Sequence, residues 1–399
     1  MIALLLAFVL AFTGIAHAQV TPGITVLLTD SAHLVNGKRV GLITNHTGRD
    51  ASGRSSIDLL FNAPGVRLTA LFAPEHGIRG SAPGGARIET GRDEKTGVRI
   101  YSLYGETRVP TRSMLENVDV LVYDIQDVGA RMYTYVWTMT LAAEAAKEAG
   151  KKFVVLDRPN PIRNDIVEGG LIEKRYRSFT GLHNVPLRYG LTPGELARYL
   201  VSGNAIDASV VVIPMKGYTK SMWWDQTGLE WVRPSPNIRD EEAALMYPGM
   251  SFFEATNLSE GRGTELPFRL VGASWLTDAA DIVRAMNARR LEGVRFETAR
   301  KRIARGEKYG GLTIPMVHVI VTDRNRIRSS EVAAHLLREI YARHPKSFRW
   351  QAGAGIEELS GARHLRAAVE HGGIDELLSQ WRRDAAQFTR ASNSSRLYR

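Results

Sequence analysis

The sequence predicts an α/β protein whose first part is built on a mostly parallel, doubly wound sheet, followed by a smaller α+β unit. Two observations lead to this fold class. In the first half, short apolar runs alternate with segments of helical periodicity, as in β/α repeats. Several of these runs are apolar at every position, which is typical of strands buried on both faces of a parallel sheet.

The elements of the first half follow from these runs in chain order. Strands are expected at residues 40–45, 67–73, 98–104, 118–123, 152–156 and 210–214. Helices are expected between them at 55–61, 133–149 and 192–200, the last with Thr192 and Glu195 spaced as a capping box. Residues 84–97 are rich in glycine and charge, so we expect a loop that lies over a site.

The second half has a different character. Residues 223–265 are rich in Trp and Pro and are expected to be irregular; such long segments are often functional. Helices at 278–287, 330–344 and 374–388 and a strand at 316–322 predict the α+β unit, and residues 391–399 read as a frayed tail. We therefore divide the chain into a leader at 1–18, a catalytic domain at 19–262 and an auxiliary domain at 263–399.

The first 18 residues have the pattern of a secretory signal peptide. They are apolar from Ile2 to Ile15 and end in Ala16, His17 and Ala18, a small-x-small cleavage pattern. The apolar run is shorter than the roughly 20 residues of a membrane span, so we expect cleavage before Gln19 and no stable membrane anchor. The mature protein is accordingly expected to be exported, either to the periplasm or to the medium.

Composition excludes several functions. With no Cys among 399 residues, the chain has no thiol nucleophile, disulfide or thiolate metal site. The net charge of +10 favours contact with anionic envelope polymers. Nucleic acid is not an expected partner, because Lys and Arg are not clustered among aromatic residues.

Polar residues follow the apolar strands at one edge of the predicted sheet. They are Asn45, Glu75 in the sequence Ala73-Pro74-Glu75-His76-Gly77, Asp124 or Asp127, and Asp157 or Asn160. In open α/β sheets, ligands bind in the crevice outside the carboxyl ends of the strands. The sequence therefore predicts a site at this edge.

Three chemistries could use such a set of residues. Dinucleotide binding is disfavoured, because no Gly-x-Gly-x-x-Gly follows the first strand. A metal hydrolase could recruit His46 and His76, but no His-x-x-x-His or comparable ligand spacing is present. A glycosidase needs two carboxyl groups at the scissile bond, and these are available together with aromatic residues. We therefore expect no cofactor and no metal.

Structural roles remain open for several of these residues. Glu75 could cap a helix after Gly77, Asp124 could pair with Arg131, and Asp127 could be a turn residue. The segment 157–160 could be mainly a rigid turn. Arg262 lies between two glycines, which suits an anion contact, and Glu260 and Glu265 beside it are candidates for a second carboxyl group.

Six motifs in this order resemble the NamZ-type exo-β-N-acetylmuramidases, a family long catalogued as a domain of unknown function. They lie at residues 41–48, 72–77, 124–131, 157–161, 234–237 and 260–264. The resemblance implies a Rossmann-like domain that carries the site and a smaller C-terminal domain that closes over it. It also implies release of N-acetylmuramic acid (MurNAc) from the non-reducing end of peptidoglycan fragments, which would be the partners of this protein.

Site residues are assigned within this resemblance. Glu75 carries over as the catalytic carboxyl and is expected to be the general acid, with Glu265, Glu260 or Asp127 as the second group. Arg131 or Arg262 is expected to bind the lactyl carboxylate of MurNAc. The full set of expected substrate-binding residues is Asn45, His46, His76, Gln126, Arg131, Tyr133, Asn160, Asn237 and Arg262.

Alternatives in mechanism and function stay open on the sequence. The 2-acetamido group of the substrate could itself attack, and retention cannot be told from inversion without the carboxyl separation. A muropeptide-binding envelope protein without turnover would use the same arginines and aromatics. A metal-dependent esterase or deacetylase of cell-wall sugars would lose its activity in EDTA.

Overall fold

The structure is a computed structural model, and it describes residues 19–79, 85–351 and 355–399. The predicted signal peptide lies outside the described residues. In the described part of the chain, no helix combines the length and apolar character needed to cross a membrane.

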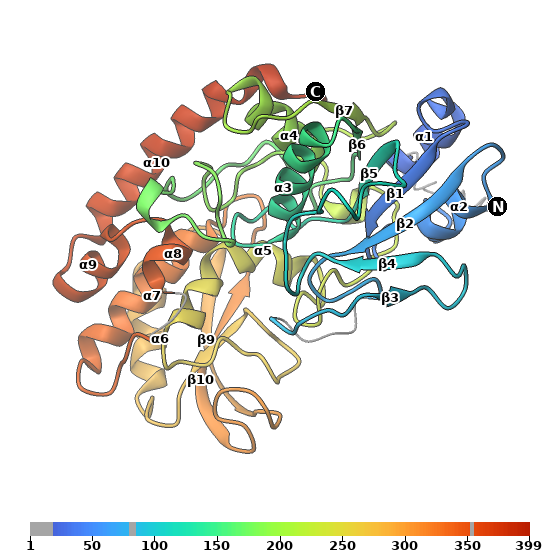
Figure 1. Cartoon of the computed structure of the whole chain (residues 1–399). Helices are drawn as coiled ribbons and strands as arrows, with labels where there is room; N and C mark the ends of the chain where they lie inside the picture. The colour runs from blue at the N-terminus through green and yellow to red at the C-terminus, as the bar shows by residue number, and fades with distance from the viewer. Residues whose placement is uncertain (1–18, 80–84, 352–354) are drawn as a thin grey trace, which may run out of the picture.

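A seven-stranded sheet forms the centre of the first part (Figure 1). Its strand order is β3 (Gly91–Arg92), β4 (Arg99–Ser102), β2 (Arg67–Ala73), β1 (Arg39–Thr44), β5 (Val120–Asp124), β6 (Lys152–Leu156) and β7 (Val210–Ile213). All neighbouring strands are parallel except β3, which pairs antiparallel with β4. The predicted mostly parallel sheet is confirmed, and β3 is a short strand inside the expected loop 84–97.

The order of the strands reverses at β1. From β1 the chain adds β2 and β4 on one side and then returns to add β5, β6 and β7 on the other. The carboxyl ends of β1 and β5 are in register, with Thr44 opposite Asp124. A crevice for ligands is expected where the loops after two such strands diverge. The polar residues predicted to follow the strands therefore lie beside the point where the strand order reverses, here called the switch point of the sheet.

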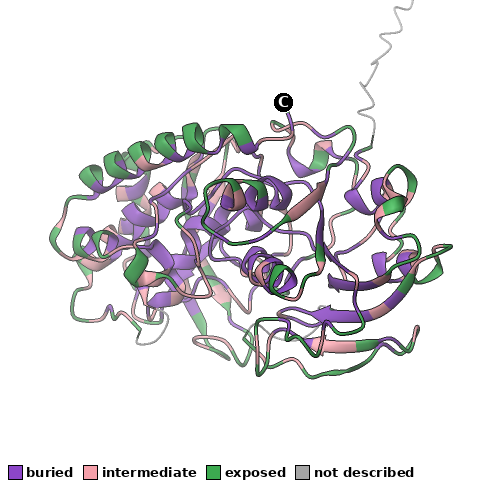
Figure 2. Ribbon diagram, turned by 45° about the horizontal axis from the view of Figure 1, so that its top comes forward, coloured by how far each residue is buried: buried purple, intermediate pink, exposed green. Residues whose placement is uncertain are grey.

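Each face of this sheet packs against its own helices. In β5, Leu121 and Tyr123 belong to the core shared with α3 (Tyr135–Glu148) and α4 (Pro193–Ser202). The intervening Val120 and Val122 face α1 (Gly23–Thr29) and α2 (Ser56–Asn62). Because both faces are covered, the strands are almost continuously apolar, and Figure 2 shows their central parts buried.

The second part contains a three-stranded antiparallel sheet of β8 (Leu270–Gly272), β10 (Thr313–Val321) and β9 (Val294–Arg302). Its helices are α6 (Ala279–Ala288), α7 (Ser329–Arg343), α8 (Ile356–Ser360), α9 (His364–His371) and α10 (Ile374–Ala391). Helix α10 is amphipathic, and Figure 2 shows its outer face exposed. The main hydrophobic core continues from the first sheet into this part, so the two parts share apolar packing.

The segment 223–265 is not irregular throughout, contrary to expectation. It contains helix α5 (Glu241–Met250), capped by the Asp240 side chain, which accepts a hydrogen bond from Ala243 N over 2.8 Å. Helix α5 packs against α7, and a Cβ added at Gly249 would lie 2.0 Å from the Ser329 carbonyl oxygen. Pro248 and Gly249 concealed the helix in the sequence, whereas close helix packing requires the glycine.

The expected frayed tail is instead docked on the first sheet, near α4 and β7 (Figure 1). The Tyr398 hydroxyl donates to Asp157 Oδ2 over 2.6 Å and accepts from Met215 N over 3.0 Å. Glu195, whose predicted capping box at α4 is confirmed, accepts Leu397 N over 2.8 Å. The prediction failed because the tail has no apolar period, while its partners come from distant segments.

Candidate active site

Glu75 lies in a turn directly after β2 and is half-buried. Its Oε2 accepts a hydrogen bond from the Thr134 hydroxyl over 2.8 Å, and its Oε1 accepts from Gly85 N over 2.9 Å. Burial together with the nearby Glu75 raises the pKa of Tyr104 to about 12. The described residues that follow Gly77, as far as 79, form a turn, so Glu75 does not cap a helix there.

Two histidines follow the strands at this edge, His46 after β1 and His76 directly after Glu75. His76 is buried and has a φ of 67°, in the left-handed region that a non-glycine residue rarely adopts. His46 Nε2 lies 2.7 Å from the Arg233 carbonyl oxygen, and its Nδ1 has no hydrogen-bond partner among the described residues. Burial lowers the pKa of His46, and the charges of Arg49 and His76 lower it further. The two predicted histidines are therefore close enough for the charge of His76 to affect the pKa of His46.

Three buried tyrosines link the two parts of the chain. The ring of Tyr133 lies 5.0 Å from that of Tyr135 and 5.9 Å from that of Tyr247, both edge to face. Burial raises the pKa of Tyr135 and of Tyr247, and the charges of Glu75 and Asp127 add to this rise at both hydroxyls. The charges of Glu75 and Asp127 therefore act on the same two phenols.

Asp127 is buried and binds hydrogen-bond donors through only one of its oxygens. Oδ2 accepts from Gly129 N over 2.6 Å and from the Tyr189 hydroxyl, whereas Oδ1 makes no hydrogen bond with the described residues. Burial raises its pKa to about 6, against the lowering effect of these donors. Such a carboxyl exchanges its proton close to neutral pH, as acid–base catalysis requires.

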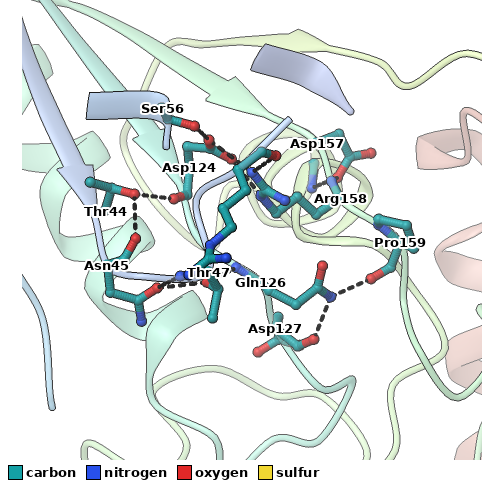
Figure 3. Close-up of polar contacts among 12 residues, drawn as sticks. Thr44, Asn45, Thr47, Ser56, Asp124, Gln126, Asp127, Asp157, Arg158 and Pro159 are labelled. Atoms are coloured by element: carbon teal, nitrogen blue, oxygen red, sulfur yellow. Dashed lines mark hydrogen bonds and ion pairs between the residues drawn. The ribbon is translucent and has the colours of Figure 1, made fainter. Parts of the chain in front are cut away.

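The loops after β1 and β5 are joined by hydrogen bonds that leave other polar atoms unused (Figure 3). Asn45 Oδ1 accepts Thr47 N over 2.9 Å, and Thr47 Oγ1 accepts Gln126 N over 2.9 Å. Gln126 Nε2 donates to the carbonyls of Asp127 and Pro159. Among the described residues, Gln126 Oε1 is buried without a partner, and Asn45 Nδ2 adjoins the Tyr135 hydroxyl without a hydrogen bond of normal geometry. These atoms offer hydrogen bonds to a ligand.

Asp124 is bound to Arg158 and not to Arg131, the partner that the sequence left open. Both residues are buried, and Arg158 donates from Nε over 2.5 Å and from Nη2 over 3.0 Å. Ser56 of α2 also donates to Asp124 (Figure 3). This network fixes the switch point and takes Asp124 out of the catalytic candidates.

Arg131 does not lie free for a substrate carboxylate, which corrects its expected role. It is fully buried and donates to the carbonyl oxygens of Gly170, Val185 and Leu359 over 2.9–3.0 Å. Burial lowers its pKa to about 9. These contacts join the first sheet to the segment before α9, so the guanidinium has a structural role that no sequence pattern reveals.

Asn160 also serves mainly to hold loops together. It donates from Nδ2 to the Leu191 carbonyl over 3.0 Å and accepts Ile162 N over 3.1 Å. Its side chain packs so closely on Gly129 that a Cβ there would lie 2.5 Å from Asn160 Oδ1. Asn237 is half-buried near Pro234, whose carbonyl accepts the Tyr135 hydroxyl over 2.9 Å.

The loop around Arg262 forms an ion cluster. Arg262 lies between Glu254 at 2.6 Å and Glu260 at 3.0 Å, and Glu260 also pairs with Lys308 at 3.0 Å. Arg262 and Glu260 are therefore paired with each other, and both are compensated within the protein. Glu265 is exposed, and its hydrogen bond to Lys301 lowers its pKa, which is opposite to the need of a general acid.

Two cavities open beside the polar edge. One of about 690 Å³ is lined by the loop after β1 and by α2, and one of about 350 Å³ by the same loop and residues 230–236. His46 and Arg49 line both. Both volumes are in the range of small-ligand sites.

The structure adds site residues that the sequence analysis missed. They are Arg49, Tyr104, Thr134, Tyr247 and Glu254. Arg49 could have been predicted from its position, because it follows the carboxyl end of a predicted strand by a few residues, as the other candidate residues do. Tyr247 and Glu254 come from α5 and the turn after it, which were expected to be irregular.

Comparisons with known proteins identify the same family along nearly the whole chain. Models for the N-terminal and C-terminal domains of the exo-β-N-acetylmuramidase NamZ match residues 40–242 and 245–398. The peptidoglycan β-N-acetylmuramidase NamZ of Bacillus subtilis (strain 168) is 40% identical over 381 residues, covering 95% of this chain and 92% of that protein. Two crystal structures of DUF1343 family proteins from Bacteroides fragilis superpose with TM-scores of 0.89 and 0.74, at 36% and 27% identity; each match covers 96% of this chain and 99% of that chain.

Proposed function

The chain belongs to the NamZ family of exo-β-N-acetylmuramidases, and we propose that Glu75 and Asp127 are the two carboxyl groups with which it hydrolyses its glycosidic bond. The protein is thus a glycosidase that acts on terminal MurNAc residues of peptidoglycan. The observation that supports the pairing is that Glu75 is hydrogen-bonded to Thr134, at the end of the loop after β5 that also carries Asp127. The charges of both carboxyl groups also act on Tyr135 and Tyr247. Glycoside hydrolysis needs two such groups around one bond.

Glu75 protonates the leaving oxygen in this proposal. The hydroxyl of Thr134 and the amide of Gly85 fix its carboxyl group at the edge of the sheet, and the side chain is half-buried, so one face remains accessible. The half-buried rings of Tyr104 and Phe179 lie 6.1 Å apart beside it, with the Arg108 guanidinium over both. Proton donation at the leaving group lowers the barrier to cleavage of the bond.

Asp127 then acts on the other side of the reaction, at the water or the developing positive charge. Its unused Oδ1 is the atom available for this role. The raised pKa of Asp127 favours a second assignment in which it donates the proton and Glu75, held by two donors, stays ionised. The two assignments predict different results for substrates with good and poor leaving groups. If Glu75 is the general acid, the activity of Glu75→Gln depends strongly on the leaving group; if Asp127 is, the activity of Asp127→Asn does.

Product analysis tests the function itself. The purified protein is incubated with the disaccharides MurNAc-GlcNAc and GlcNAc-MurNAc, each with and without EDTA, and products are resolved by mass. We expect free MurNAc from the first disaccharide only, unaffected by EDTA. Binding without cleavage would support a muropeptide-binding protein. A lighter disaccharide with an intact bond, or loss of activity in EDTA, would support a metal-dependent deacetylase or esterase.

We also propose that the protein is exported and acts in the envelope or the medium. The support is the leader pattern of residues 1–18 and the net charge of +10. Mass spectrometry of the protein purified from its native host tests this. The expected amino terminus is Gln19, whereas an intact chain beginning at Met1 in the cytoplasmic fraction would contradict it.

A further inference from the structure

We propose that Arg49 binds the lactyl carboxylate of the terminal MurNAc and thereby sets the preference for muramic acid over glucosamine. The inference rests on the proposed function and replaces Arg131 and Arg262 in that role. MurNAc differs from N-acetylglucosamine by the lactyl ether, so the residue that reads this group determines the specificity. A guanidinium is the side chain best matched to a carboxylate, because its two Nη atoms can bind both oxygens.

Three arginines that could be considered for this role, Arg131, Arg262 and Arg158, are already engaged within the described part of the chain. Arg131 donates to three carbonyl oxygens in the core, and Arg262 is held between Glu254 and Glu260. Arg158 is bound to Asp124. A substrate carboxylate could bind these groups only by breaking buried hydrogen bonds, which is costly.

Arg49 differs from them. Its Nε donates to the His46 carbonyl over 2.9 Å, and its own carbonyl accepts Arg158 Nη2 over 2.8 Å. Within the described part of the chain, its Nη1 and Nη2 have neither a hydrogen bond nor an ion pair, although Glu230 lines the smaller cavity with it. Its backbone and Nε are thus fixed while its outer nitrogens remain available, which limits the entropy lost on binding a carboxylate.

The surroundings of Arg49 suit a terminal sugar. It lines both cavities of the loop after β1 together with His46, whose buried Nδ1 is unpartnered. The charge of Arg49 acts on His46, and so does that of His76, the neighbour of Glu75 in the chain. Arg49 and Glu75 thus follow neighbouring strands, β1 and β2, at the same edge of the sheet.

Arg54 provides a matched comparison. It lines the larger cavity as Arg49 does, but its guanidinium binds Asp50 at 2.7 Å. Arg79 at the same cavity is likewise bound to Asp93. The positive charge of each is thus already paired with an aspartate, whereas Arg49 has no such pair among the described residues.

The test compares two nitrophenyl β-glycosides, one of MurNAc and one of MurNAc whose lactyl carboxylate has been converted to the methylamide. Wild type should prefer the acid. Arg49→Gln should lose about 10- to 100-fold in kcat/KM on the acid, the effect of one hydrogen-bonded charge pair, and change little on the amide. Arg54→Gln should keep the wild-type ratio. Activity on the amide shows that the variant is folded.

Calorimetric titration with free MurNAc gives a readout that does not need turnover. Arg49→Gln should bind MurNAc about 10-fold or more weakly and keep its affinity for N-acetylglucosamine. Equal losses on acid and amide, or an unchanged ratio in Arg49→Gln, would overturn the role of Arg49. Wild type that cleaves neither glycoside but binds MurNAc through Arg49 would overturn the proposed function and leave this inference standing.

Discussion

The hydroxyl of Thr134, the residue before α3, donates a hydrogen bond to Oε2 of Glu75 over 2.8 Å. Glu75 lies in the turn after β2, so this bond joins two segments that the chain separates by about 60 residues. Gly85 of the neighbouring loop donates to the other carboxyl oxygen. The reactive carboxylate is therefore oriented by two segments that no local pattern connects.

Thr134→Val removes this donor and keeps the shape of the side chain. We expect kcat to fall about 5- to 20-fold with little change in KM, because Glu75 loses one of its two positioning bonds. Steady-state kinetics on the nitrophenyl glycoside measures this. Thr140→Val, in the same helix, removes a bond to the Trp137 carbonyl and should leave kcat unchanged. Equal kinetics in the two variants would remove the positioning role of Thr134.

Two buried aspartates predict a pH dependence of stability. Burial raises the pKa of Asp127 to about 6 and that of Asp157 to about 7, from an ordinary value of 3.8. Between the ordinary pKa and the raised pKa of each aspartate, the native state binds more protons than the unfolded state. The free energy of unfolding therefore falls as pH rises from about 4 to 7. The pKa shift of Asp127 corresponds to at most about 3 kcal/mol.

Urea denaturation at a series of pH values measures this dependence. Asp127→Asn should flatten the decline between pH 4 and 6, whereas Asp207→Asn, on the surface, should follow wild type. Parallel curves for wild type and Asp127→Asn would show that Asp127 does not titrate in that window.

The docked C-terminus predicts a stability effect at Tyr398. Tyr398→Phe leaves Asp157 without one donor and Met215 N without its acceptor, so we expect a loss of about 1–3 kcal/mol in the free energy of unfolding. Removal of the exposed Arg399 alone should cost little. Denaturant titration of both variants measures this, and equal stabilities would mean that the Tyr398 hydroxyl contributes nothing to stability.

The ion cluster at Arg262 predicts a change in stability without a change in specificity. Arg262→Met removes the ion-pair partner of the part-buried Glu254 and should cost about 1–3 kcal/mol in the free energy of unfolding. The ratio of kcat/KM for the MurNAc acid and amide should stay at its wild-type value. Arg284→Met, which breaks a surface pair with Asp281, should change neither. A reduced acid-to-amide ratio in Arg262→Met would return Arg262 to the specificity site.

The sequence predicts the first sheet well because its strands are apolar on both faces. The predicted ranges 67–73 and 152–156 coincide with β2 and β6. Their order along the chain also places Glu75 and the loop of Asp127 at one edge, since parallel strands end together. In contrast, β9 is mostly charged or exposed and gives no such signal.

The roles of individual arginines could not be predicted in the same way. Arg131 and Arg49 follow strand ends at similar distances, yet one is bound to three core carbonyls and the other has free outer nitrogens. What distinguishes them is the set of distant segments that pack against each. Burial and pairing of a charge depend on tertiary structure. The position of the candidate site could therefore be predicted from the sequence, but the role of each residue within it could not.

The measurement that tests the account most directly is the leaving-group dependence of Glu75→Gln. The variant and wild type are assayed on MurNAc-GlcNAc, with a poor leaving group, and on dinitrophenyl β-MurNAc, with one that departs without a proton. We predict a loss of about 100-fold or more on the first and a much smaller loss on the second. Equal losses on both, or sensitivity in Asp127→Asn instead, would contradict the assignment of Glu75 as the general acid.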